Sequence, residues 1–169
     1  MSVIRKLFIF FFFFNINNFV QSNENIVFVD LDYIFENSNP GKSILSNLNK
    51  INDENIKNLQ LKENKLKEQE DQIIKKQNII SVEQFDKEVN LLKDKIKIFR
   101  DEKDKMTNEF TNLKKSLISD FFKKINPIVE EYMVEKSVNI IIDKKIIFLG
   151  LKTSDATSDI LSKINKNFN

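Results

Sequence analysis

The sequence contains no cysteine, histidine or tryptophan, and it has only two glycines and two prolines in 169 residues. Without cysteine and histidine, the chain cannot form disulfides, Cys/His zinc sites, thiol nucleophiles or Ser-His-Asp triads. Two glycines are too few for a dinucleotide-binding or phosphate-binding loop. These absences disfavour most classes of enzyme, and we expect a protein without catalytic residues, metal or cofactor.

The charge of the chain is nearly balanced. The net charge is +2 at pH 7, and Arg5 and Lys6 supply this excess within the first 22 residues. From residue 23 onward there are 25 basic and 25 acidic side chains, which argues against a nucleic-acid binder because such proteins carry a clear basic excess. Residues 42–125 hold 19 basic and 15 acidic side chains, so the middle of the chain is mildly basic.

The first 22 residues have the order of a secretory signal peptide. The two positive charges precede an unbroken apolar run at residues 7–14, and a polar segment follows at residues 15–22. The apolar run is too short for a membrane-spanning helix, which needs about 20 residues. We expect residues 1–22 to be a signal peptide that is cleaved after Ser22 and directs export. An uncleaved membrane anchor and a buried core segment are the alternatives.

Short elements come next, before a long stretch suited to helix. The β-branched apolar run at residues 26–29 predicts a buried strand, and residues 32–36 can form one helical turn. The sequence Asn39-Pro40-Gly41 predicts a break in the chain. No glycine or proline follows until Pro127, which should kink or restart the helix.

Apolar residues repeat every seven positions along this stretch. In the first half, one heptad position is apolar apart from Asn52, whereas its companion position is polar after Leu48. In the second half, both positions are apolar apart from Lys103. The apolar position of the first half holds Leu45, Leu59, Leu66, Ile73 and Ile80. The two positions of the second half hold Val82, Val89, Ile96, Phe110 and Leu117, and Phe85, Leu92, Phe99, Met106 and Leu113.

A helix start at Ser81 divides the two halves. Ser81 and Gln84 match a Ser-x-x-Gln capping box, and Ile80 and Phe85 can form the accompanying hydrophobic staple. The two helices should then run antiparallel as a hairpin. At about 1.5 Å per residue, the first helix at residues 42–80 would be roughly 55 to 60 Å long.

The apolar period changes from helical to extended after Lys136. Residues 138–142 and 146–149 each predict a short strand, and residues 143–145 predict the tight turn between them. Asp155 or Thr157 can then cap a last helix. The apolar side of this helix would carry Ile160, Leu161 and Ile164.

Together these elements predict an α+β fold that is mostly helical. Residues 23–40 and 126–169 would form a small β-rich body, and residues 41–125 a long antiparallel helical hairpin, called the arm below. Three short strands leave bare sheet edges that one chain cannot cover, so we expect the body to self-associate. The residues expected to build this oligomerisation body are Ile26, Phe28, Ile140, Ile142, Ile146 and Phe148.

Two groups of residues resemble a nucleotide-binding loop and a metal site, but neither group is sufficient evidence for such a site. Gly41-Lys42-Ser43 looks like the end of a phosphate-binding loop, but Glu36 stands where that loop needs its first glycine. Asp30, Asp32 and Glu36 are close enough in sequence for a metal site, although acidic residues at a strand end are commoner. We therefore assign neither nucleotide nor metal binding.

More apolar residues lie in the arm than its heptad seam can bury. The surplus residues are Ile56, Ile74, Ile79, Leu91, Ile98 and Ile118. In a two-helix hairpin such residues would be exposed, and exposed apolar patches commonly bind partners. The residues that we expect to contact a partner are Ile56, Ile74, Ile79, Ile80, Val82 and Ile98.

The order of these parts resembles the OmpH family of periplasmic chaperones, also called the Skp family. The resemblance covers essentially the whole chain and rests on the signal peptide, the short strand at 26–30, the Lys-rich hairpin and the closing segment. Its most specific part is strand, strand and then Asp155-Ala156-Thr157-Ser158-Asp159-Ile160-Leu161. Strong basic charge is typical of the family and is missing here, so no lipopolysaccharide site is carried over.

The resemblance implies a homotrimer whose strands form a small β-barrel, with three arms that enclose a cavity. It also implies an ATP-independent holdase in the periplasm, which binds unfolded outer-membrane proteins and prevents their aggregation. Peripheral contact with the membrane surface is a further partner hypothesis. The alternatives are an envelope-associated structural coiled coil or scaffold, and a prefoldin-like cytoplasmic protein.

Overall fold

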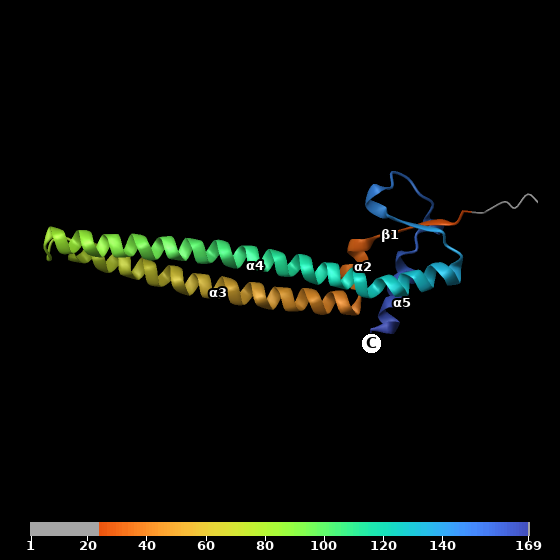
Figure 1. Ribbon diagram of the computed structural model, residues 1–169, viewed down its shortest axis with the longest axis horizontal. Helices are drawn as coiled ribbons and strands as arrows, with labels where there is room; N and C mark the ends of the chain where they lie inside the picture. Colours follow the sequence, from red (N-terminus) through yellow and green to blue (C-terminus); the bar gives the residue numbers. More distant parts are fainter. Residues whose placement is uncertain (1–23, 169) are drawn as a thin grey trace, which may run out of the picture.

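The computed structural model describes residues 24–168, and the signal-peptide prediction lies outside the described residues. A long helical hairpin projects from a small body that contains the strands and the remaining helices (Figure 1). The elements are β1 (Ile26–Val29), α2 (Leu31–Asn37), α3 (Asn39–Lys76), α4 (Val82–Lys136), β2 (Ile140–Asp143), the 3-10 helices η1 (Lys144–Ile146) and η2 (Lys152–Ser154), and α5 (Thr157–Asn167). The predicted mostly helical α+β fold is therefore confirmed, while a barrel made by several chains stays a prediction.

Helix α3 begins at Asn39, so the predicted break at residues 39–41 is wrong. The buried Ser38 is its N-cap, and the Ser38 hydroxyl accepts a hydrogen bond from the Gly41 amide at 3.2 Å. Pro40 is tolerated because amides in the first helical turn need no partner within the helix. Gly41 is required because a Cβ there would lie 1.7 Å from the carbonyl oxygen of Phe35.

The hairpin turn lies close to its predicted position. Helix α3 ends at Lys76, and the Ser81 hydroxyl caps α4 by accepting a hydrogen bond from the Gln84 amide at 3.3 Å. Most predicted seam residues are half-buried between the two helices, whereas Val82 and Leu113 are exposed. The seam prediction thus holds along most of the arm and fails at Val82, the start of α4, and at Leu113.

Helix α4 continues through Pro127, so this proline does not restart the helix, while the alternative prediction of a kink stays a prediction. A proline inside a helix removes one backbone hydrogen bond and costs about 3 kcal/mol. Phe121, Ile125 and Tyr132 are buried on both sides of it, and their packing in the body offsets this loss. The helix ends at Ser137, which adopts the left-handed conformation with φ 52°.

The sheet consists of β1 and β2, which pair in parallel from Ile26 opposite Ile140 to Val29 opposite Asp143. On the other side of β1, Phe28 forms an isolated bridge with Asp155. The predicted second strand at residues 146–149 does not form, because within the described chain it has no strand to pair with. Instead, the Asp143 carboxylate accepts a hydrogen bond from the Lys145 amide at 3.0 Å and starts η1.

The hydrophobic core lies where α5 and the body end of α4 meet α2 and the sheet. Ile160 and Ile164 of α5 are almost fully buried, as the sequence predicts for its apolar side. The rings of Phe35 and Phe121 meet edge to face with centroids 5.0 Å apart. The N-cap of α5 is Ala156 rather than Asp155 or Thr157, and the Asp155 carboxylate accepts a hydrogen bond from the Thr157 amide at 3.0 Å.

Candidate functional site

The arm buries little of its apolar surface. From residue 49 to residue 120 every side chain is at least partly exposed, including those on the seam. Beyond Leu48, α3 contributes one apolar heptad position to the seam, whereas α4 contributes two. The arm therefore presents apolar surface to solvent along its whole length.

The structure exposes most of the residues predicted to contact a partner. Ile79 and Val82 are 79% and 78% exposed at the tip of the arm, and Ile80 between them is half-buried. Ile74 is exposed close to this tip, and Ile98 farther along α4. Ile56, also exposed, lies about 30 Å from the tip along α3, so these residues do not form one compact site.

Ile118 does not belong to the exposed surplus. It lies at the body end of α4 and packs, half-buried, against the hydrophobic core. The heptad pattern could not show this, because the core partners of Ile118 come from distant segments of the chain. Leu91 is exposed as expected, and Leu61, which the pattern missed, is exposed as well.

Three polar contacts join α3 to α4 at intervals of one heptad. They connect Lys62 to Glu102, Gln69 Oε1 to Lys95 Nζ at 3.0 Å, and Lys76 Nζ to Glu88 at 3.1 Å. Steps of seven residues along α3 match steps of seven back along α4, so these contacts keep one antiparallel register. We call this set the ladder. Its α3 members occupy the polar companion position of the seam, where they replace apolar packing.

Most of the residues predicted for oligomerisation are exposed on the body. Ile26, Ile140, Ile146 and Phe148 are exposed, and residues 24–168 leave the Phe148 side chain fully exposed. Ile142 is half-buried. Leu149 and Leu151 are exposed as well, so the exposed apolar segment spans residues 146–151. Of its apolar residues, only Ile146 and Phe148 were predicted to take part in oligomerisation.

Phe28 is the exception among these body residues, because it is buried within the single chain. A Cβ on Gly150 would lie 2.7 Å from its ring, so Gly150 lets the apolar segment cross Phe28 closely. Phe28 therefore packs beneath this segment, outside the main core cluster, and is not itself exposed.

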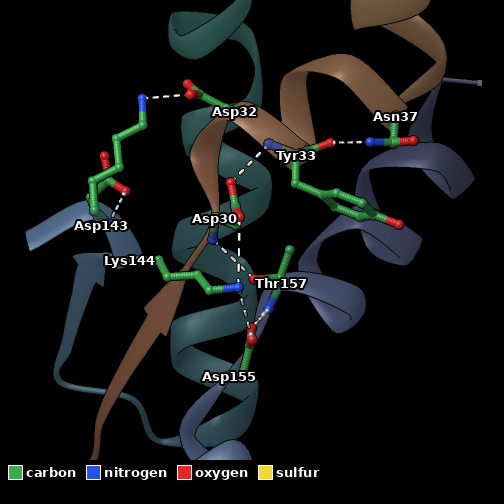
Figure 2. A network of polar contacts seen from close by, with 9 residues as sticks. Asp30, Asp32, Tyr33, Asn37, Asp143, Lys144, Asp155 and Thr157 are labelled. Atoms are coloured by element: carbon green, nitrogen blue, oxygen red, sulfur yellow. Dashed lines mark hydrogen bonds and ion pairs between the residues drawn. The ribbon is translucent and has the colours of Figure 1, made fainter. Parts of the chain in front are cut away.

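A polar network fixes the start of this exposed segment to the body (Figure 2). The Asp30 carboxylate accepts a hydrogen bond from the Tyr33 amide at 3.0 Å and caps α2, and the Asp30 amide donates to the Thr157 hydroxyl at 2.9 Å. Lys144 lies between two carboxylates, 3.7 Å from Asp30 and 3.9 Å from Asp155. Three segments that are distant in sequence thus meet at one point.

The charges of this network shift the pKa values of its members. The hydrogen bond with Asp32, at 2.6 Å, raises the pKa of Lys145 above its usual 10.5. The hydrogen bonds from Thr157 lower the pKa of Asp155 below 3.8, and Lys144 adds to this effect. Asp30 and Asp32, considered above as metal ligands, both pair with lysines, and residues 24–168 contain no group of three acidic residues that could hold a metal ion.

Residues 25–164 match the model of a protein family described as outer membrane protein (OmpH-like). The chain belongs to the OmpH-like family. The match runs from the residue before β1 to Ile164 in α5, so it includes both the body and the arm. The family resemblance seen in the sequence is confirmed.

The OmpH-like fold is also found among solved structures. A crystal structure of a candidate outer membrane chaperone (OmpH-like) from Caulobacter crescentus CB15 aligns with a TM-score of 0.77. The alignment covers 85% of this chain and 85% of that chain at 12% sequence identity, so it shows a shared fold. No curated protein matches the chain. Within residues 24–168, no helix is long and apolar enough to cross a membrane.

Proposed function

We propose that this OmpH-like protein is an ATP-independent holdase chaperone of the periplasm, which binds unfolded outer-membrane proteins and prevents their aggregation. The observation that carries the proposal is the series of exposed aliphatic side chains along the arm, in which no side chain between residues 49 and 120 is fully buried. Membership of the OmpH-like family supports the same role.

The proposed clients need such a surface. The strands of outer-membrane proteins are amphipathic, and before insertion their apolar faces and unpaired edges aggregate. The arm offers separate small contacts, at Ile56, Ile74 and Ile98 and at the tip. Many weak contacts hold a client through avidity, while each one releases easily.

Release then needs no nucleotide. Insertion of the client into the outer membrane removes it from the binding equilibrium, so the chaperone gives it up without an energy source. Gly41, the first residue of the apparent phosphate-loop sequence, lies inside the first turn of α3 with its amide bonded to Ser38. This arrangement disfavours a phosphate-binding loop at that position.

The proposed assembly is a homotrimer, in which three arms surround a client cavity. Two observations support self-association: the apolar segment 146–151 that follows β2 is exposed, and within residues 24–168 strand β2 pairs only with β1. A second and a third chain would cover these side chains and complete the sheet edges. Peripheral contact with the membrane surface is a further part of the proposal.

The experiment uses the mature protein, residues 23–169, and an outer-membrane porin unfolded in urea. After dilution of the urea, light scattering should stay low when the protein is present. Addition of ATP should not alter this scattering. Uninhibited porin aggregation would contradict the holdase proposal and favour a structural role in the envelope. Inhibition that requires ATP would contradict the proposed mechanism.

A further inference from the structure

A small hollow of about 210 Å³ opens between two neighbouring contacts of the ladder, in the tip half of the arm. It is lined by Gln69, Gln72, Ile73 and Lys76 of α3 and by Glu88, Leu91, Leu92 and Lys95 of α4. Ile73 and Leu92 are half-buried seam residues, and Leu91 is 54% exposed. The hollow therefore has apolar walls between two polar ends.

The size of the hollow limits what it can hold. Sites for cofactors and drug-sized ligands have volumes of roughly 300–1,000 Å³. A hollow of about 210 Å³ is smaller than this range. It suits one large apolar side chain, inserted from a chain that lies across the surface of the arm.

The two polar ends differ in charge. At one end the carboxylate of Glu88 neutralises Lys76 at 3.1 Å. At the other end the ammonium of Lys95 donates to the neutral amide of Gln69 at 3.0 Å, so this contact leaves the positive charge of Lys95 unbalanced. A carboxylate beside the inserted side chain would complement Lys95. Gln72 offers an amide that can bond the backbone of the same segment.

We propose that this hollow binds an extended segment of unfolded polypeptide, which inserts one aromatic or large aliphatic side chain and places an adjacent carboxylate next to Lys95. The proposal rests on the proposed holdase function and specifies the client feature that this part of the arm recognises. Exposed aliphatic residues continue beyond the hollow at Ile98 and at Ile79, so the segment meets further apolar surface on the tip half of the arm.

The test measures binding of fluorescent ten-residue peptides to the mature protein by anisotropy. One peptide carries Phe-Asp in a Gly/Ser background, a second Ser-Asp and a third Phe-Lys. The Phe-Asp peptide should bind about tenfold more tightly than either of the others, since it alone supplies both the apolar side chain and the carboxylate.

Two variants place the contact on the arm. Leu91→Ser should weaken binding of the Phe-Asp peptide about five- to tenfold. Lys95→Gln should reduce the preference for Phe-Asp over Phe-Lys. The matched control is Leu61→Ser, because Leu61 is 52% exposed on α3 but does not line the hollow. This control should bind the peptide like the unchanged protein.

Equal binding of the three peptides would overturn the proposal, and so would equal losses in Leu91→Ser and Leu61→Ser. Light scattering with unfolded porin separates this failure from failure of the proposed function. If the protein still keeps porin in solution, the hollow is not the recognition site and the holdase function stands. If porin also aggregates, the holdase function itself is wrong.

Discussion

Replacing Ile74, Ile79 and Ile98 together with serine should weaken the holding of an unfolded porin while the arm stays helical. All three side chains are exposed, so their loss removes no packing from the seam. Isoleucine and serine have similar helix propensities, which leaves the helices themselves little changed. The circular dichroism of the variant should match that of the unchanged protein.

The size of the effect follows from the apolar surface that a client can cover. Each aliphatic contact contributes about 1 kcal/mol of burial, so the three substitutions remove about 3 kcal/mol per arm. That loss corresponds to about a 100-fold change in a dissociation constant when all three residues touch the client. In an oligomer the loss multiplies across the arms.

The assay is porin turbidity at two salt concentrations. Val134→Ser is the matched control, because Val134 is 81% exposed at the body end of α4, away from the arm tip. The control should hold porin like the unchanged protein. If the triple variant also holds porin normally, and holding is strongly salt-sensitive, then the Lys-rich faces bind the client and the apolar account is refuted.

Other predictions concern the body and the chain start. Gly41→Ala should lower the free energy of unfolding by about 3 kcal/mol, measured by urea denaturation, because its Cβ would meet the Phe35 carbonyl; an unchanged midpoint would contradict the close approach. Phe148→Asp should lower the solution mass without loss of helicity, and a mass unaffected by the change would place the interface elsewhere. Asp155 has a lowered pKa in the folded state, so its contribution to stability is present above the unfolded value of about 3.9 and disappears as the pH falls below it. Asp155→Asn should therefore reduce acid sensitivity in that range, and an identical pH profile would exclude this role. N-terminal sequencing of the exported protein should begin near Asn23, whereas an intact Met1 would show that no signal peptide is cleaved.

Local patterns were sufficient to predict the hairpin. Residues such as Leu66, Leu92 and Phe99 repeat with the heptad period, and their half-burial follows from helix geometry alone. The cap at Ser81 also depends only on neighbouring residues. Most of the exposed aliphatic residues on the arm were also predictable, because a two-helix seam leaves other positions uncovered.

The errors arise where distant segments decide the structure. Residues 146–149 have strand-like composition, but a strand also needs a pairing partner, and none is available within the described chain. The Asn39-Pro40-Gly41 sequence resembles a break, yet Ser38 and the packing against Phe35 make it a helix start. The ladder and the hollow could not be predicted, because both depend on the register between α3 and α4.

We infer that several copies of this chain jointly hold one unfolded outer-membrane protein. Native mass spectrometry of residues 23–169, mixed with an unfolded porin and no nucleotide, tests it most directly. We expect a trimer of the chain alone, and a complex of three chains with one porin after mixing. A monomer that forms no complex with the porin would contradict it.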